Sequence, residues 1–421
     1  MSDAALVPPS LEQIHQRQLD RLRVSLREIL RSNSFYRDRL HDVRTWQDFE
    51  RLPFTTKAEL MANQLASPPF GTNLTYPLER YVRMHQTSGT SGTRPLRWLD
   101  TAESWEWWTR IWAEHVFGAA RVGQKDRVFL AFSFGPFIGF WSAFSGAERI
   151  GALVISGGGM TTEQRLRTML DLDATIICCT PTYALRLSAA AAELGMDLAG
   201  SAIRATIHAG EPGASIPATR DAIEAAFGAR CYDHTGMTEL GPTGVSCDQS
   251  NGVHLIESEF VVEVIDQDGR TMSAAPVAEG ELVMTNLGRV GSPVIRYRTG
   301  DRVRLTREPC PCGNPFPRLE GGILGRVDDM FTVRGVNLYP SQVEAITRRH
   351  PQVLEWRIEV GRRRQMDEVT LLFESESSGR NVAATLATEL RQALGARIEC
   401  RRVERGSLPR AELKSNRLHR V

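Results

Sequence analysis

Lysine is nearly absent from this chain. It occurs only at positions 57, 125 and 414, although lysine and arginine together number 51. The segment around Lys414 is otherwise rich in arginine. A lysine in that setting suggests a need for a compact ammonium group, which differs from a planar guanidinium in hydration and hydrogen-bond geometry. We therefore treat Lys414 as a candidate functional residue, with a solvated surface cation as the alternative.

Long apolar runs, a charge excess and a signal sequence are also missing. The longest apolar stretches, such as 174–179, are far too short to span a bilayer. A net charge of +1 gives no reason to expect nucleic acid or an acidic membrane as a partner. The N-terminus lacks the charged and apolar regions of a signal peptide. The seven scattered cysteines are odd in number, which favours a reducing compartment, so we expect a cytoplasmic protein.

The pattern of apolar residues divides the chain into three parts. From about residue 126, strands alternate with short helices, which predicts a mostly parallel sheet. From about residue 253 the helical pattern stops, and alternating strands with an Asp268-Gly269 turn predict antiparallel β structure. The last part predicts a small α+β module. We expect an α/β fold with a large domain at 1–326, including a β subdomain at 253–324, and a small domain at 327–421.

Helical and alternating periodicities predict the individual elements. The expected helices are 10–42, 141–150, 161–172, 181–194, 340–349 and 382–394. The expected strands are 127–132, 152–156, 174–179, 203–208, 254–265, 280–286, 332–334, 354–360, 368–374 and 397–403. Ligands of parallel sheets bind beyond the carboxyl ends of the strands, so the loops after Phe132, His208 and Tyr232 are the places to look. No G-x-G-x-x-G fingerprint follows the first strands, which argues against a dehydrogenase.

A loop rich in glycine and hydroxyl groups, TSGTSGTRP, occupies 87–95. Glycines let the backbone approach a phosphate closely, and N–H and hydroxyl groups can bind its oxygens. The loop is not a Walker sequence, because no Lys-Ser/Thr pair follows Gly92. It is a candidate phosphate loop, and a flexible surface loop is the alternative.

Two carboxylates follow strands in positions that suit a nucleotide. Glu239 ends the segment YDHTGMTE at 232–239 and could hold a magnesium ion that bridges phosphates. Asp301 follows a glycine turn in RTGD at 298–301 and could accept both hydroxyls of a ribose. A solvated loop glutamate and an ordinary turn aspartate are the alternatives.

These three segments, in this order, resemble motifs of the adenylate-forming acyl and aryl CoA ligase superfamily. HAGEP at 208–212 resembles its adenine loop, GRVDDM at 325–330 its interdomain hinge, and LPRAELK at 408–414 its catalytic-lysine segment. LPFTTK at 52–57 and CPCG at 310–313 resemble the phenylacetate–CoA ligase-like branch. The resemblance covers nearly the whole chain and implies a mobile C-terminal domain.

The resemblance implies a reaction in two steps. A carboxylate attacks the α-phosphate of ATP to give an acyl-adenylate and pyrophosphate, and a thiol, usually that of coenzyme A, then displaces AMP. Lys414 would stabilise the developing charge, Glu239 would bind Mg²⁺, Asp328 would be the hinge, and Arg334 and Gly335 would serve the thiol step. The implied nucleotide-binding residues are Ser88, Gly89, Thr90, Ser91, Gly92, Thr93, Gly210, Glu211, Pro212, Tyr232, Asp233, Thr238, Asp301 and Arg326.

The phosphate loop departs from the family pattern at one position. The family commonly has a lysine just after the last glycine, where this chain has Thr93 followed by Arg94. A guanidinium can also donate to phosphate, but with different geometry.

Four residues of zinc-preferred type flank the expected antiparallel segment. Cys247 and His254 precede it, and Cys310 and Cys312 follow it. Four N and S ligands would make a closed, structural site, and some members of the related branch bind zinc in a similar arrangement. A buried Cys247 and a proline-flanked turn at 309–312 are the alternatives.

Aromatic and small residues after the strands suggest a pocket for a planar acid. The candidates are Phe132, Phe134, Phe137, Ile138, Trp141, Ala209, His234 and Thr235. We expect an aryl-acid ligase that uses ATP, Mg²⁺ and coenzyme A. Transfer to a carrier-protein thiol or to an amine, and a non-catalytic nucleotide-binding protein, are the alternatives. The sequence is also compatible with a homodimer.

Overall fold

The computed structural model describes residues 10–87, 94–139, 141–250, 252–272, 275–327, 329–333, 336–363, 366–375, 380–409 and 417–420. Its helical segments are α1 (Leu11–Ser32), α2 (Trp46–Glu50), α3 (Lys57–Ala66), η1 (Leu78–Arg80), α4 (Ala102–Ile111), η2 (Trp112–Phe117), α5 (Trp141–Ile150), α6 (Thr162–Asp171), α7 (Pro181–Glu193), α8 (Pro217–Phe227), α9 (Pro340–Thr347) and α10 (Arg380–Leu394).

The strands of the large N-terminal part are β1 (Tyr81–Gln86), β2 (Arg97–Thr101), β3 (Arg127–Leu130), β4 (Leu153–Ser156), β5 (Ile176–Cys179), β6 (Ala205–His208), β7 (Arg230–Met237), β8 (Gly241–Ser246), β9 (Val253–Leu255), β10 (Phe260–Ile265), β11 (Val277–Asn286), β12 (Tyr297–Thr306), β13 (Arg318–Leu319) and β14 (Gly325–Arg326). Those that follow are β15 (Phe331–Val333), β16 (Val336–Leu338), β17 (Val353–Arg363), β18 (Met366–Ser375), β19 (Glu399–Val403) and β20 (Leu418–Arg420).

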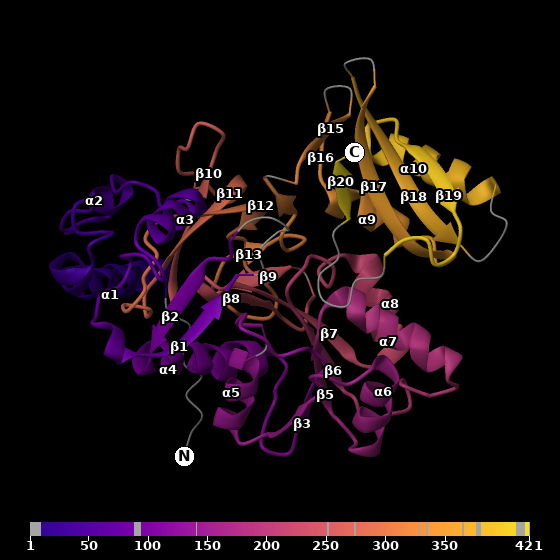
Figure 1. The fold of residues 1–421 in the computed structure, drawn as a ribbon, viewed down its shortest axis with the longest axis horizontal. Helices are drawn as coiled ribbons and strands as arrows, with labels where there is room; N and C mark the ends of the chain where they lie inside the picture. Colours follow the sequence, from indigo (N-terminus) through magenta and orange to yellow (C-terminus); the bar gives the residue numbers. More distant parts are fainter. Residues whose placement is uncertain are drawn as a thin grey trace.

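One large sheet runs through most of the chain (Figure 1). Its strand order is β10-β11-β12-β13-β9-β8-β7-β6-β5-β3-β4, with β14 paired to β12. Strands β3 to β7 pair in parallel, and from β7 onward the pairing is antiparallel. The expected parallel and antiparallel parts are therefore both present, and β7 joins them into one sheet.

The parallel part is covered on both faces, because alternate residues of a strand point to opposite sides. Phe129 and Cys179 pack against α6, α7 and α8 in one core cluster. Val128 and Cys178 pack against η2 and α5 in another. The two adjacent cysteines are thus core residues, as expected.

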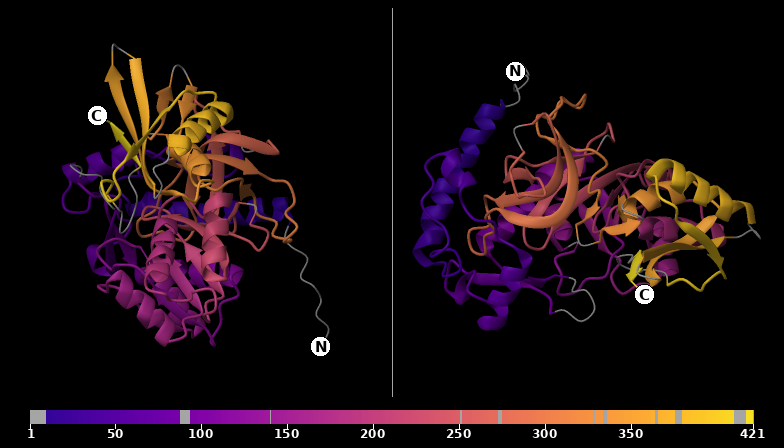
Figure 2. Two further views of the ribbon diagram at one scale, coloured as in Figure 1. Left: turned by 90° about the vertical axis from the view of Figure 1, so that its right-hand side faces the viewer. Right: turned by 90° about the horizontal axis from the view of Figure 1, so that it is seen from above.

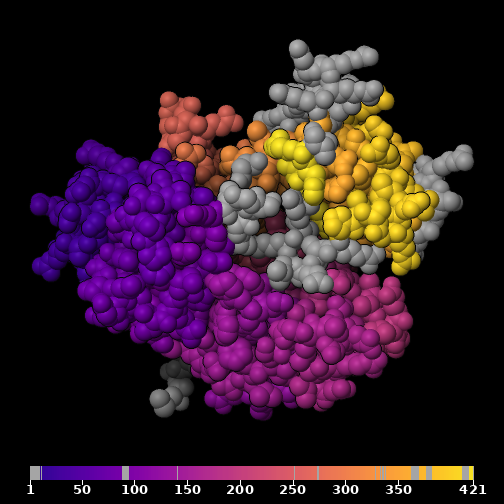
Figure 3. Space-filling view, viewed as in Figure 1, coloured from indigo at the N-terminus to yellow at the C-terminus, as the bar shows by residue number. Residues whose placement is uncertain are grey.

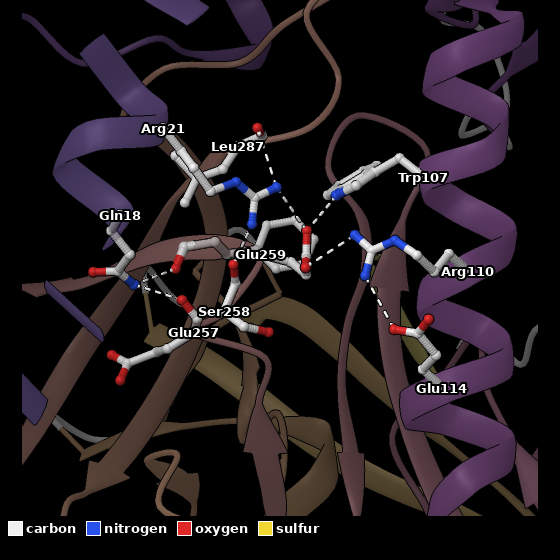
Figure 4. Close-up of polar contacts among 10 residues, drawn as sticks. Gln18, Arg21, Trp107, Arg110, Glu114, Glu257, Ser258, Glu259 and Leu287 are labelled. Carbon is white, nitrogen blue, oxygen red and sulfur yellow. Dashed lines mark hydrogen bonds and ion pairs between the residues drawn. The ribbon is translucent and has the colours of Figure 1, made fainter. Parts of the chain in front are cut away.

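A buried carboxylate holds α1 and α4 against the start of β10 (Figure 4). Glu259 accepts hydrogen bonds from Arg21 at 2.8 Å and from the indole of Trp107 at 2.6 Å. Arg110 of α4 lies 3.0 Å from its other oxygen. Because Glu259 is almost fully buried, these three donors compensate for the water that it loses.

The C-terminal part has its own sheet, of order β19-β18-β17-β20, with α9 and α10 packed on it. It forms a separate mass beside the helical layer of the large part (Figures 2 and 3). The small α+β module expected from the sequence is therefore present. Among the described helices, none has both the length and the apolarity needed to cross a membrane.

Two sequence expectations need correction near the N-terminus. The expected helix at 10–42 ends at Ser32, because the buried Asn33 side chain accepts hydrogen bonds from the N–H groups of Phe35 and Tyr36 and turns the chain. The antiparallel hairpin of β1 and β2 was not expected at all. It is central to the site, since the 87–95 loop connects its strands.

Candidate active site

The carboxyl ends of β6 and β7 form the edge where the sequence predicts a nucleotide. Asp233 of β7 is 6% exposed and accepts a hydrogen bond from the Ser215 hydroxyl. A Cβ on Gly322, in the turn after β13, would lie 3.2 Å from the same carboxylate. Burial raises the pKa of Asp233 to about 6, although hydrogen bonds from Ser215 and the backbone act against the rise.

The loop after β6 begins next to Asp233, because His208, the last residue of β6, is the register partner of Asp233. Gly210 there has a φ of 98°, which favours glycine. The Oε1 atom of Glu211 accepts a hydrogen bond from the N–H of Thr182 at 3.0 Å. Thr182 lies in the first turn of α7, where a carboxylate is stabilised by the helix dipole. The structure therefore fixes the expected adenine loop next to Asp233.

Glu239 lies just beyond β7 and is 5% exposed. The hydroxyl of Tyr297 donates to its Oε1 atom at 3.3 Å. Burial, with a further contribution from the charge of Glu239, raises the pKa of Tyr297 well above its usual value, so the phenol keeps its proton. The guanidinium of Arg289 donates to the backbone carbonyls of Thr238 and Glu239. Both the side chain and the backbone of the predicted magnesium ligand are thus held in place.

Asp301 and Arg326 form the expected pair on neighbouring strands. They are register partners of β12 and β14, and Arg326 Nη1 donates to Asp301 Oδ1 at 3.1 Å and to the Thr299 carbonyl at 2.8 Å. Gly300 has a φ of 74°, and a Cβ there would lie 2.9 Å from the guanidinium. Tyr297, which holds Glu239, lies on the same strand as Asp301, so the two carboxylates are linked through β12.

Aromatic side chains gather in the loop after β3. The ring of Phe134 lies 4.6 Å from that of Trp141, and the ring of Phe132 lies 5.9 Å from that of Phe137. Phe132, Phe134 and Ala209 are partly buried and pack against the same core cluster. The structure thus brings together these members of the predicted acid pocket.

His234 and Thr235 lie on β7, the strand that joins the parallel and antiparallel parts of the sheet. His234 Nδ1 lies 2.8 Å from the Gly244 carbonyl, and its ring is 4.5 Å from that of Trp112. Burial lowers the pKa of His234 to about 4, so at neutral pH its Nδ1–H donates to Gly244. The Thr235 hydroxyl lies 3.0 Å from that of Thr243.

Tyr232 is separated from the other predicted nucleotide residues. It is the strand neighbour of Asp233 and therefore points to the opposite face of β7. It is part of the core cluster on that face, and its hydroxyl donates to Asp248 at 2.6 Å. The structure gives Tyr232 a packing role, which a sequence motif cannot distinguish from a binding role.

Several predicted residues lie outside the described residues: Ser88, Gly89, Thr90, Ser91, Gly92, Thr93, Asp328, Arg334, Gly335 and Lys414. The described chain beside them is anchored. Thr87 N–H donates to the Leu96 carbonyl at 2.9 Å, and Leu96 N–H donates to the Thr87 hydroxyl at 3.1 Å, which closes the base of the predicted phosphate loop. Leu408 and Arg417 are hydrogen-bonded to β18 and β17.

The C-terminal part contacts the nucleotide edge through α9 and the residue before it. A Cβ on Gly325 would lie 2.6 Å from the ring of Tyr339, so these two residues meet closely. Burial raises the pKa of Glu344 on α9, and the nearby charge of Glu211 adds to this rise. The start of α9 therefore lies against β14, and α9 also contacts α8, in this conformation.

The four predicted zinc ligands come together on β8, β9 and the turn before β13. The ligand atoms of Cys247, His254, Cys310 and Cys312 all lie within 4.8 Å of one another. Two of the separations are 3.8 Å, between the sulfurs of Cys247 and Cys310, and 3.5 Å, between the sulfur of Cys312 and His254 Nε2. His254 Nδ1 lies 2.9 Å from the Phe316 carbonyl, which leaves Nε2 as the ligand atom.

Comparisons with known proteins point to one family. Residues 335–420 match the family model described as the AMP-binding enzyme C-terminal domain. Phenylacetate–coenzyme A ligase of Escherichia coli (strain K12) is 31% identical over 430 residues, which cover 97% of this chain and 95% of that protein.

Solved structures add a conformational comparison. 2-Hydroxyisobutyryl-CoA ligase in its postadenylation state, in complex with 2-HIB-AMP, is 28% identical, with a TM-score of 0.92 over 100% of this chain and 94% of that one. In its thioesterification state, with 2-HIB-AMP and CoA, the TM-score is 0.73 over 100% of this chain and 95% of that one. The present arrangement is thus more similar to the postadenylation state. The 31% identity over nearly both full lengths shows that the chain belongs to the phenylacetate–coenzyme A ligase family of adenylate-forming enzymes.

Proposed function

We propose that this AMP-forming acid–CoA ligase activates an aromatic carboxylic acid and passes the acyl group to the thiol of coenzyme A. The observation that carries the proposal is that Tyr297 and Asp301 lie on the same strand, β12, where Tyr297 bonds to Glu239 and Asp301 bonds to Arg326. Asp301 and Arg326 would bind the ribose hydroxyls, since a carboxylate accepts two hydrogen bonds from a diol. Gly210, Glu211, Pro212 and Asp233 would line the adenine site, and Ser88 to Thr93 with Thr238 would hold the phosphates. Tyr232 is left out of this set because it bonds to Asp248.

The residues near Glu239 suit a magnesium ion. Mg²⁺ usually takes one or two protein carboxylates together with substrate phosphates, and Glu239 is a buried carboxylate at the nucleotide edge. Bound there, the ion would neutralise charge on the leaving pyrophosphate. The chain's own contribution is to fix Glu239, because Tyr297 holds the carboxylate and Arg289 holds the backbone.

Lys414 would stabilise the charge that develops between the acid and the α-phosphate. An ammonium positioned in this way acts on the transition state more than on the bound substrate. We propose that the domain at 327–421 then rotates about Asp328, which withdraws Lys414 and brings Arg334 and Gly335 to the thiol step. The closer similarity to a postadenylation state supports an arrangement that precedes this rotation.

The group formed by Cys247, His254, Cys310 and Cys312, called the sulfur cluster below, suits a structural zinc ion. For a tetrahedral site with Zn–S of about 2.3 Å and Zn–N of about 2.0 Å, ligand atoms should be about 3.8 Å apart for two sulfurs and about 3.5 Å apart for sulfur and nitrogen. The distances of 3.8 and 3.5 Å match these values. Burial lowers the pKa of His254, which favours the neutral imidazole that binds metal.

The acid would lie against the aromatic residues after β3. Phe132, Phe134 and Trp141 provide flat apolar surface, which suits a planar ring better than a long alkyl chain. Neutral His234 has its Nδ1 engaged by Gly244, so Nε2 would be the atom that accepts a hydrogen bond from a ring substituent. The relative named phenylacetate–coenzyme A ligase supports an arylacetate among the candidates.

Carboxylate-dependent exchange between ATP and pyrophosphate tests the proposal. We expect exchange with at least one member of a panel of benzoates and arylacetates, followed by consumption of coenzyme A with release of AMP. An absence of exchange with every acid would contradict the proposal. Release of AMP without consumption of coenzyme A would instead indicate a carrier-protein or amine acceptor.

A further inference from the structure

An ion pair on the hairpin that carries the predicted phosphate loop is completely buried. Asp100 and Arg289 are 0% and 1% exposed. Arg289 Nε and Nη2 donate to the two carboxylate oxygens of Asp100, each at 2.7 Å. The guanidinium lies 4.9 Å from the ring of Trp108 and 5.4 Å from that of Trp98. A fork of two parallel hydrogen bonds in a dry site is rigid and specific in direction.

The pair links two parts of the nucleotide site that are far apart in the sequence. Asp100 is on β2, in the hairpin whose connection is the predicted phosphate loop. Arg289 follows β11, and its Nη1 donates to the carbonyls of Thr238 and Glu239. One guanidinium therefore holds the hairpin with one edge and the backbone of the predicted magnesium ligand with the other.

Such a pair is not explained by stability alone. Two charges lose their hydration when they are buried, and this cost can exceed the gain from their mutual attraction. Apolar residues of similar size often stabilise a fold equally well or better. A planar donor fork is useful where two backbone segments must keep a fixed separation. We propose that Asp100 and Arg289 are positioning residues for adenylation, which hold the backbone of Glu239 at a fixed distance from the β1–β2 hairpin. This inference rests on the proposed role of Glu239.

The chain contains a matched control elsewhere. Arg296 donates to both oxygens of the buried Glu263, at 3.1 and 2.7 Å. Its Nη1 donates to the carbonyls of Glu50 and Leu52, and its guanidinium lies 4.3 Å from the ring of Phe54. The architecture is the same, but the carbonyls that it holds belong to the end of α2 and the segment after it rather than to the nucleotide site.

The experiment compares Asp100→Asn and Arg289→Lys with Glu263→Gln. ATP–pyrophosphate exchange is measured at varied Mg²⁺ concentration, with the acid most active in the panel. Thioester formation is measured separately, from the supplied adenylate of that acid and coenzyme A. We expect exchange in the two site variants to fall by about tenfold or more, with a higher Mg²⁺ concentration at half-maximal rate. Thioester formation should stay within about twofold of the unchanged protein.

Glu263→Gln should lose stability in chemical unfolding but leave the ratio of the two half-reactions unchanged. An equal loss of both half-reactions in Asp100→Asn, no loss at all, or the same selective loss in Glu263→Gln would overturn the inference. Failure of both site variants to fold would make the pair a purely stabilising element and would overturn it as well. Glu239→Gln separates the two ideas, because retained exchange in that variant would refute the role of Glu239 itself.

Discussion

The nucleotide edge and the sulfur cluster both join strands of the large sheet, but they use their polar groups in opposite ways. In the sulfur cluster, Cys247, His254, Cys310 and Cys312 direct their ligand atoms toward one another. At the nucleotide edge, each carboxylate is instead held by a partner from another element, as Tyr297 holds Glu239 and Arg326 holds Asp301. In the proposed function, the first arrangement binds only an ion, whereas the second holds groups that bind a substrate. Changes at the edge should therefore reduce activity before stability, and changes in the cluster should do the reverse.

The largest expected effect is on activity and comes from Lys414→Ala. Removing one charged donor from a transition state lowers the rate by about a thousandfold, so ATP–pyrophosphate exchange should fall by at least that factor. ATP binding and the unfolding midpoint should not change. Lys125→Ala is the matched control, because Lys125 is an exposed lysine in the turn before β3. A Lys414→Ala variant that keeps its exchange rate would show that the lysine is wrongly assigned.

Cys312→Ser tests the expectation that changes in the sulfur cluster reduce stability before activity. We expect it to lose zinc and about 3 kcal/mol of unfolding free energy, because loss of a metal is among the most destabilising changes, while the activity of the folded fraction is kept. Elemental analysis of the unchanged protein, purified without chelator, should find about one zinc per chain. Cys400→Ser, in β19 outside the cluster, is the control. If a chelator leaves the unfolding of the unchanged protein unaffected, the structural zinc proposal fails.

The sequence predicted the two regions to different extents. Local patterns were enough for the alternating strands and helices, and the motif order placed Glu239, Asp301 and Arg326 in one site. The zinc ligands could be grouped from the sequence because few residue types bind zinc. In the structure, the pairing of β9 with β13 returns the chain to His254.

What the sequence could not predict depends on packing between distant elements. Tyr232 lies in the motif, but strand alternation turns it into the core. Asn33 ends α1 through its own side chain, a local signal that helical periodicity does not detect. Arg289 and Asp100 lie 189 positions apart and carry no motif, so only the fold brings them together.

The smallest expected effect is a pH dependence of stability at the nucleotide edge. The pKa of Asp233 is about 6 in the folded chain, raised mainly by burial from the usual 3.8. A raised folded pKa means that the folded state binds more protons than the unfolded state between these values. Stability from this group is therefore fully present below about pH 4 and is lost as the pH rises through 6. Between pH 5 and 7 the loss should be about 1 kcal/mol.

Asp233→Asn removes this loss, because an amide cannot ionise and its oxygen can still accept the Ser215 hydroxyl. The unfolding free energy of the unchanged protein, measured by denaturant, should fall relative to that of Asp233→Asn between pH 5 and 7, because buried histidines such as His234, whose lowered pKa acts in the opposite sense, are common to both proteins. Ser215→Ala sharpens the comparison, since the hydrogen bond from Ser215 lowers the pKa of Asp233 and its loss should move the fall to higher pH. Parallel profiles for the unchanged protein and Asp233→Asn would mean that water reaches this carboxylate freely. The raised pKa of Asp233, which depends on its burial, would then be contradicted.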